Sequence, residues 1–221
     1  MSNKNSRFAS FLLEGKAQAI VLYGTSLSYH LSPPLRSALQ AHFGEQATIV
    51  NSGMAGCASR TGISQIEQKV LAHKPDLVLM EFAINDAHDY HHEPEARDAG
   101  ISPQESRENL LTLVSLIQDA LPATEILLWT TNPTRDVQGS LMRGRSARPR
   151  LETYYQGVRE VASARGLRVI EAERFWKSLQ ERLGAEFDAL IPDGVHPNPK
   201  ALREYFVPFL LDELGVPAQS S

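Results

Sequence analysis

Short apolar runs alternate with longer segments of helical periodicity along this chain, and this alternation most restricts its fold. Five runs are predicted to be strands: Ala19–Tyr23, Thr48–Asn51, Asp76–Ala83, Glu125–Thr130 and Arg168–Glu171. All but the last are apolar almost throughout, as expected for strands that helices cover on both faces. The pattern therefore predicts an α/β fold built on a mainly parallel sheet.

Six segments between and after these runs are predicted to be helices. In one of them, Leu110, Leu113, Val114 and Ile117 recur at helical spacing, which indicates one buried face. No internal repeat and no linker is visible, so we expect a single domain over residues 1–221 with its core at about 19–214. The predicted helices are Pro34–His42, Gly62–His73, Pro103–Ala120, Leu151–Ala164, Ala172–Leu183 and Pro199–Leu214.

Composition excludes several classes of protein. A hydrophobic share of 42% and a charged share of 22% are ordinary for a globular chain of 221 residues and argue against disorder, collagen and coiled coil. The net charge of −4 argues against a nucleic-acid partner. The single cysteine, Cys57, excludes an internal disulfide. No apolar run reaches the roughly 18 residues of a membrane span, and Phe8–Leu13 is short for a signal peptide. We therefore expect a cytoplasmic location, with export by another route left open.

The first strand leads directly into Gly24, Thr25 and Ser26. A turn of small residues at that point places Ser26 at the carboxyl edge of the sheet, where open α/β sheets bind ligands. An exposed hydroxyl there could act as a nucleophile, and the backbone N–H of Ser26 could point into the same site. The alternative is that Ser26 only caps the next helix.

Near the other end of the chain, Asp193 precedes His196 by three residues. Pro192, Pro197 and Pro199 make this segment stiff and non-helical. The carboxylate can fold back onto one imidazole nitrogen, which orients the ring and leaves the other nitrogen free as a base. The alternative is an Asx turn with His196 beside it on the surface. Together, Ser26, His196 and Asp193 would supply a nucleophile, a base and an orienting group.

Acyl transfer also needs donors for the developing oxyanion. Gly56 lies in a glycine-rich turn after the second strand, and Asn85 follows the third strand. A backbone N–H at Gly56 and the side-chain amide of Asn85 could both donate at the edge that carries Ser26. The alternatives are an ordinary turn for the glycine and a helix cap for Asn85.

These residues resemble the SGNH/GDSL hydrolase family in four blocks that keep the family's order and rough spacing. The blocks are Gly24–Ser28, Asn51–Gly56, Ala83–Asp86 and Asp193–His196. The resemblance spans about residues 19–214. It implies a three-layer α/β/α sandwich (flavodoxin-like) around a five-stranded, mainly parallel sheet of order 2-1-3-4-5.

The same resemblance assigns roles to five residues. Ser26, His196 and Asp193 would form the catalytic triad, and Ser26, Gly56 and Asn85 would form the oxyanion hole, with no cofactor and no metal. Two positions depart from the family pattern, because Thr25 stands for the usual Asp and Ala83 for the usual Gly. Neither change removes a reacting group.

The function that follows is a serine esterase acting on a small-molecule ester of a short acyl group, such as an acetyl group on a carbohydrate. An acyltransferase or a thioesterase would use the same triad. A different class, a non-catalytic carbohydrate-binding module on this fold, is disfavoured because every reacting group is present. The oligomeric state is not predicted.

Other polar clusters allow two interpretations. A group of histidines and acids is either a solvated loop or the metal site of a metal-dependent hydrolase: Asp86, His88, Asp89, His91, His92 and Glu93. Five arginines after the fourth strand either are solvated or hold an anionic substrate: Arg135, Arg143, Arg145, Arg148 and Arg150. Tyr29 and His30 either line the pocket or pack against the first helix. Glu81 interrupts an apolar strand and receives no role.

Overall fold

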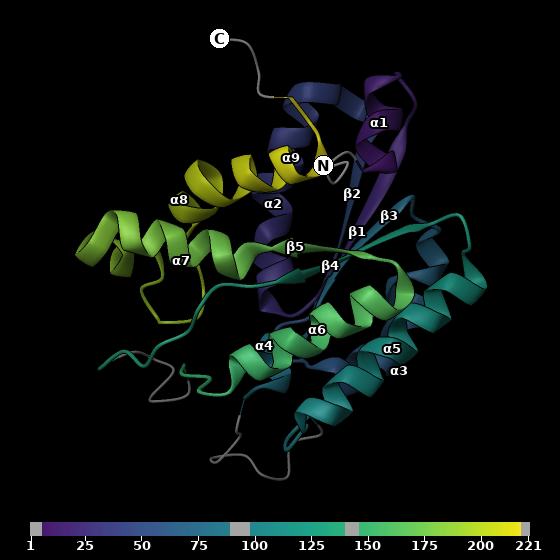
Figure 1. The fold of residues 1–221 in the computed structure, drawn as a ribbon. Coiled ribbons are helices and arrows are strands. Elements are labelled where there is room, and N and C mark those ends of the chain that lie inside the picture. The colour runs from purple at the N-terminus through teal and green to yellow at the C-terminus, as the bar shows by residue number, and fades with distance from the viewer. Residues whose placement is uncertain (1–5, 89–97, 140–145, 218–221) are drawn as a thin grey trace.

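The computed structural model describes residues 6–88, 98–139 and 146–217. Five parallel strands form one sheet in the order β2-β1-β3-β4-β5, as the family resemblance implied (Figure 1). Each of the five predicted runs forms a strand. Their bounds are β1 (Gln18–Gly24), β2 (Ala47–Gly53), β3 (Leu77–Glu81), β4 (Glu125–Thr130) and β5 (Arg168–Glu171).

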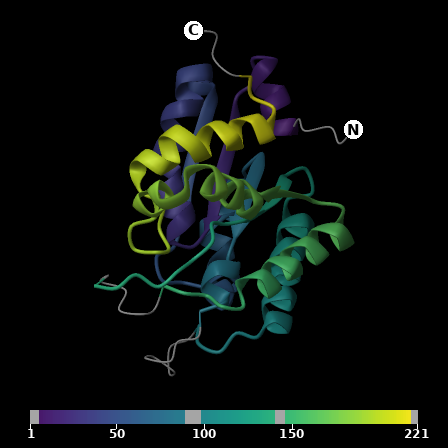
Figure 2. The ribbon, with the colours of Figure 1, turned by 60° about the vertical axis from the view of Figure 1, so that its left-hand side comes forward.

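Helices cover both faces of the sheet and complete three layers (Figures 1 and 2). One face carries α3 (Ser59–Lys69), α5 (Pro103–Ala120) and α6 (Leu151–Arg165). The other carries α2 (Ser26–Phe43), α7 (Ala172–Leu183), α8 (Pro199–Ala201) and α9 (Val207–Leu214), with a π-helical turn over Leu202–Phe206. The short helix α4 (Ala83–Asp86) follows β3, and α1 (Arg7–Leu13) lies at the amino end of the sheet. Three 3₁₀ turns complete the described elements: Gly44–Gln46, Leu71–His73 and Gly184–Leu190.

An aromatic cluster fastens the C-terminal helices to the sheet. The ring of Phe206 stacks on Trp129 of β4 and on Trp176 of α7, at centroid distances of 5.4 and 5.6 Å. Phe175 stacks on Phe209 of α9 at 4.3 Å. Aromatic pairs of this kind stabilise a core beyond their buried area. The cluster therefore fixes the position of the segment before α8, which carries Asp193 and His196.

Helix α2 begins at Ser26, not at the predicted Pro34. The side chain of Thr25 caps it by accepting a hydrogen bond from the N–H of Leu27. Pro33 and Pro34 lie inside the helix, so the carbonyls of the residues four positions earlier lose their helical donors. The side-chain amide of Asn51 on β2 replaces one of those donors, because it donates to the carbonyl of Tyr29 at 3.2 Å.

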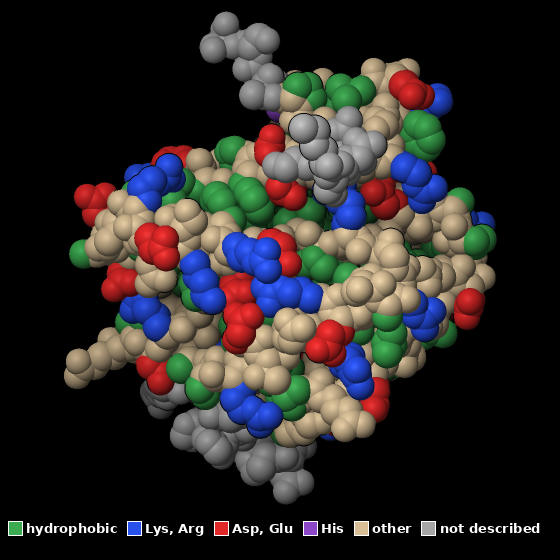
Figure 3. Space-filling view, in the orientation of Figure 1, with side chains coloured by type: hydrophobic (Ala, Val, Ile, Leu, Met, Phe, Trp, Pro, Cys, Tyr) green, Lys and Arg blue, Asp and Glu red, His purple; other side chains and the backbone are tan. Residues whose placement is uncertain are grey.

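Charges of both signs mix on the face formed by α6 and α7 (Figure 3). Arg159 makes ion pairs with Glu152, Glu171 and Glu173, and Lys177 also pairs with Glu173. No large area of one sign is visible in this view. Within the described parts of the chain, no helix is long and apolar enough to cross a bilayer.

Leu79 of the central strand β3 tests how much of the stability comes from the sheet core. It is fully buried, whereas Leu13 of α1 is 53% exposed. We expect Leu79→Ala to lower the free energy of unfolding by about 2–5 kcal/mol, because the substitution leaves a cavity. The same change at Leu13 should cost less than about 0.5 kcal/mol. Urea unfolding of both variants measures this, and equal losses would contradict the assignment of the core.

Candidate active site

The ends of β1, β2 and β3 lie at one level, which brings three sequence blocks to the same edge. Gly24 pairs in register with Gly53 on one side and with Glu81 on the other. A Cβ at Gly24 would overlap the backbone and carboxylate of Glu81, and a Cβ at Gly53 would overlap the backbone of Tyr29. Glycine is therefore required at both positions for the strands and α2 to approach this closely.

A chain of hydrogen bonds joins residues 170 positions apart. The Oγ of Ser26 lies 2.8 Å from Nε2 of His196, and Nδ1 of His196 lies 2.6 Å from Oδ2 of Asp193. An ionised carboxylate only accepts hydrogen bonds, so Nδ1 carries the proton and Nε2 is free to accept from Ser26. The structure thus brings the predicted nucleophile, base and orienting group together in that order.

The carboxylate of Asp193 does both things that the sequence allowed. Its Oδ1 accepts from the backbone N–H groups of Val195 at 2.9 Å and His196 at 2.7 Å, which closes the Asx turn, while Oδ2 holds the imidazole. Burial by itself raises the pKa of Asp193, but the hydrogen bonds from His196 and Val195 outweigh it and hold the pKa below its ordinary value. The group therefore stays ionised at neutral pH.

The turn that carries Asp193 and His196 is tied to the segment after β4. The amide of Asn132 donates to the carbonyl of Val195 at 2.7 Å, and the hydroxyl of Ser146 donates to the carbonyl of Asp193 at 2.6 Å. Gly194 has a φ of +83°, and a Cβ there would overlap the carbonyl oxygen of Arg135. Only glycine fits that position, because both the backbone angle and the space exclude a side chain.

Glu81, to which the sequence assigned no role, holds the turn around Ser26. Its Oε1 accepts from the N–H and hydroxyl of Thr25, at 2.7 and 2.9 Å, and from the hydroxyl of Ser28 at 2.8 Å. The side chain is fully buried, and this burial raises its pKa to about 7 although the hydrogen bonds from Thr25 and Ser28 lower it. The only signal in the sequence was a carboxylate in an apolar strand, which needs partners.

The other two predicted donors lie on neighbouring segments. Gly56 has a φ of +73° in a turn closed by the N–H of Cys57 and the carbonyl of Met54, at 3.2 Å. Asn85 is buried in α4, and its Nδ2 donates to the carbonyl of Cys57 at 2.8 Å. This bond uses one of the two N–H groups of the Asn85 amide. The side chain of Asn85 thus fastens α4 to the glycine turn.

Asp86 lies inside the protein, which corrects its placement in a solvated or metal-binding cluster. Its carboxylate accepts from the N–H of Ser59 at 2.8 Å and the hydroxyl of Ser106 at 2.5 Å, and burial raises its pKa to about 6. Residues 89–93 of that cluster lie outside the described residues. In the part of the chain that the structure describes, no three His, Cys, Asp or Glu residues are placed to hold a metal.

Two arginines of the loop after β4, for which the sequence left solvation and anion binding open, donate to main-chain carbonyls. Arg148 is buried, and its Nε donates to the carbonyl of Ile84 at 3.0 Å, directly before Asn85. Arg135 donates to the carbonyls of Asp188 and Ile191 on the segment before Asp193. Residues 143 and 145 lie outside the described part of the chain. These arginines brace the backbone around the site, a role that depends on contacts between distant segments.

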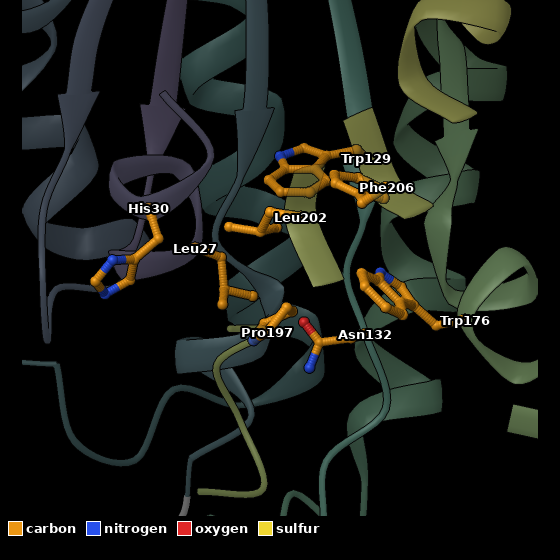
Figure 4. Close-up of a pocket in the computed structure, with 8 residues that line it drawn as sticks. All are labelled: Leu27, His30, Trp129, Asn132, Trp176, Pro197, Leu202 and Phe206. Carbon is orange, nitrogen blue, oxygen red and sulfur yellow. The ribbon is translucent and has the colours of Figure 1, made fainter. Parts of the chain in front are cut away.

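His30 lies on the first turns of α2, and its ring contacts that of His196 edge to face, with 5.6 Å between the ring centroids. Burial lowers the pKa of His30, and the neighbouring His196 lowers it further. His30 also lines a small cavity of about 10 Å³, whose walls are mostly apolar (Figure 4). It is lined by Leu27, His30, Trp129, Asn132, Trp176, Pro197, Leu202 and Phe206. Room for about one water molecule excludes a substrate from this cavity.

Known proteins share this sequence pattern and fold. The model of the GDSL-like Lipase/Acylhydrolase family matches residues 22–203. An arylesterase of Vibrio mimicus is 23% identical over 215 residues, which cover 92% of this chain and 93% of that protein. The acetylxylan esterase Axe2 of Geobacillus stearothermophilus superposes with a TM-score of 0.75 at 20% identity, over 94% of this chain and 99% of that chain. LAE5, an alpha/beta hydrolase enzyme from the metagenome of Lake Arreo, has a TM-score of 0.73 at 22% identity, over 92% and 98% of the two chains.

The fold and the match over most of the chain define an α/β enzyme that hydrolyses esters. The chain belongs to the GDSL-like lipase/acylhydrolase family.

Proposed function

We propose that the chain is a serine esterase in which Ser26 is the nucleophile, His196 the general base and Asp193 the group that orients the base. The observation that carries this proposal is the continuous hydrogen-bonded chain from Ser26 Oγ through the imidazole to Asp193. The low pKa of Asp193 supports it, because an ionised carboxylate stabilises the imidazolium that forms when His196 takes a proton.

The reaction proceeds in two halves. Ser26 Oγ attacks the ester carbonyl while its proton passes to Nε2 of His196, and the resulting tetrahedral intermediate carries a negative oxygen. His196 then gives the proton to the leaving alcohol, which leaves an acyl group on Ser26. Water attacks this acyl group with His196 again as the base, so the carboxylic acid departs and Ser26 regains its proton.

The negative oxygen of each intermediate would be bound by three donors: the N–H of Ser26, the N–H of Gly56 and the side-chain amide of Asn85. The bond from Asn85 to Cys57 supports this arrangement, since it holds the amide against the turn that contains Gly56. Burial of Asn85 also supports it, because a donor shielded from water stabilises a developing charge more strongly.

The proposed substrate is a small ester of a short acyl group, such as an acetylated carbohydrate. Two names among the similar proteins support this class: the arylesterase and the acetylxylan esterase. Three structures of the latter are of catalytic mutants, in which a serine, an aspartate or a histidine is replaced by alanine. These three residue types are the ones that meet at Ser26, Asp193 and His196.

Replacement of Ser26 by alanine tests the mechanism. We expect wild-type protein to hydrolyse p-nitrophenyl acetate and to take up one fluorophosphonate label, which intact mass and peptide mapping place on Ser26. Ser26→Ala should lose the label and lower kcat by about 10⁴-fold or more, because no other group replaces the nucleophile. Ser64→Ala, a change at an exposed serine of α3, is the control. Labelling of folded Ser26→Ala protein, or no activity in folded wild type, would contradict the proposal.

Replacement of Asn85 by alanine tests the oxyanion hole. Loss of one donor should lower kcat for p-nitrophenyl acetate by about 10²–10³-fold, with a smaller change in KM, because the donor acts mainly on the transition state. Circular dichroism and urea unfolding show whether the variant is folded. A folded variant with wild-type kcat would remove Asn85 from the proposed site.

A further inference from the structure

An open groove of about 350 Å³ lies on the side of the site that carries His196. One wall comes from the first three turns of α2, and the other from the prolines that follow His196 and from the π-helical turn after α8. The volume is in the range of small-molecule sites in proteins. The residues that define its two walls are Tyr29, His30, Pro33, Pro197, Pro199 and Arg203.

One wall of the groove is formed by residues that follow the proposed nucleophile on the same helix. Tyr29, His30 and Pro33 follow Ser26 by three, four and seven positions on α2, so all four lie on one face of that helix. His30 also contacts the ring of His196. In the proposed reaction His196 protonates the leaving alcohol, whereas the carbonyl oxygen faces Gly56 and Asn85. The alcohol part of the ester must therefore leave on the side of His196, where the groove begins.

The walls of the groove combine apolar rings with polar groups. Tyr29 is 50% exposed, and proline rings lie beside it. Pro33 and Pro34 cannot donate to the carbonyls of Tyr29 and His30. The amide of Asn51 donates instead to the carbonyl of Tyr29, at 3.2 Å.

Among the described residues that line the groove, Arg203 is the only Lys, Arg, Asp or Glu. Arg203 is exposed and makes no ion pair with any described residue, and none of the residues that line the groove is acidic. Because burial and His196 lower the pKa of His30, its ring is neutral at pH 7 and can both donate and accept a hydrogen bond. A ligand with an apolar face and several hydroxyl groups matches these walls, as a pyranose ring does.

We propose that this groove binds the alcohol part of the ester and selects a pyranose-sized polyol, with its apolar face on Tyr29 and its hydroxyl groups toward His30 and Arg203. This inference rests on the proposed function. It specifies the alcohol part of the substrate, which the triad leaves open.

Two acetates that differ only in the alcohol test the groove: a mono-acetylated methyl pyranoside and ethyl acetate. We expect kcat/KM to be at least 10-fold higher for the pyranoside. Tyr29→Ala should lower kcat/KM for the pyranoside by about 3- to 10-fold, the range expected for a lost ring contact, and change that for ethyl acetate by less than 2-fold. Arg203→Ala should also lower kcat/KM for the pyranoside more than kcat/KM for ethyl acetate.

The controls are Phe11→Ala, an exposed aromatic ring on α1, and Arg174→Ala, an exposed arginine on α7. Neither should alter the ratio of the two substrates. An unchanged ratio in Tyr29→Ala and Arg203→Ala, or equal losses on both acetates, would overturn the groove as the alcohol site. Absence of all hydrolysis in wild type would instead contradict the proposed serine mechanism itself.

A second inference comes from the contacts of Glu81, which are independent of the groove. A single oxygen, Oε1, accepts the four bonds from Thr25 and Ser28, the residues on either side of Ser26 and Leu27. The second oxygen receives only a longer contact of 3.2 Å from the hydroxyl of Thr25. The turn that carries the proposed nucleophile is therefore held by one buried acceptor on the neighbouring strand.

We infer that Glu81 is a positioning residue, which acts through Thr25 and Ser28 to hold Ser26 at the distance from His196 that proton transfer needs. It does not touch the substrate. Since the acceptor is one oxygen, a glutamine can keep that oxygen in place, whereas a methionine of similar length cannot.

The test compares Glu81→Met with Glu81→Gln on p-nitrophenyl acetate. The methionine variant should lower kcat and the rate of fluorophosphonate labelling by about 10- to 100-fold with KM within 2-fold, because a misplaced nucleophile slows the chemical step. The glutamine variant should restore kcat to within about 5-fold of wild type. Thr25→Val, which removes the hydroxyl contact to Glu81, should fall between them and serves if Glu81→Met does not fold.

Glu173→Met is the matched control, since Glu173 is another buried carboxylate and lies on α7 among Arg159 and Lys177. It should lower stability in urea and leave kcat within 2-fold. Wild-type kcat in folded Glu81→Met or Thr25→Val protein, or a glutamine variant no better than the methionine one, would overturn the positioning role. If the fluorophosphonate does not label Ser26 in wild-type protein, the result would instead contradict the proposed function.

Discussion

The parallel register of β1 with β2 and β3 is the constraint on which the site depends. It brings Gly24, Gly53 and Glu81 to one level, so the three segments that follow leave the sheet side by side. The absence of a side chain at Gly24 lets β3 approach β1 closely, and its absence at Gly53 lets α2 approach β2. A one-residue shift in either pairing would turn the side chains to the opposite face and separate these segments. The pairing of the strands therefore determines where the residues of the site lie.

Buried carboxylates then hold the ends of these segments. Glu81 binds the turn around Ser26, and Asp86 binds the start of α3 just after the glycine turn. Burial raises the pKa of both, whereas hydrogen bonds hold the pKa of the more exposed Asp193 below its ordinary value. The three carboxylates thus have different roles, because the surroundings of each one determine which charge state is favoured. Glu81 and Asp86 order the backbone, and Asp193 keeps the negative charge beside the proposed base, His196.

The sequence predicted the five strands, the fold class and the residues that meet at the edge of the sheet. It missed the start of α2, because prolines are disfavoured inside a helix, whereas here Pro33 and Pro34 lie inside it and Asn51 replaces one of the lost donors. It also missed the bracing by Arg148 and the role of Glu81 in the turn. Each of these depends on a contact between segments far apart in the chain. The catalytic roles of Ser26, His196 and the donors stay predictions, which the geometry supports.

What the sequence determined by itself was local: apolar runs that must be buried as strands, glycines at the turns, and an Asp placed three residues before a His. These follow from periodicity and from short-range geometry, so they can be read without knowledge of the fold. Only the tertiary structure decided that Ser26 meets His196 across 170 positions, and that an open groove begins beside them. The physical reason is that the aromatic cluster around Phe206 and the bond from Asn132 to Val195 hold the end of the chain against β4 and the segment after it, at the edge of the sheet where Ser26 also lies.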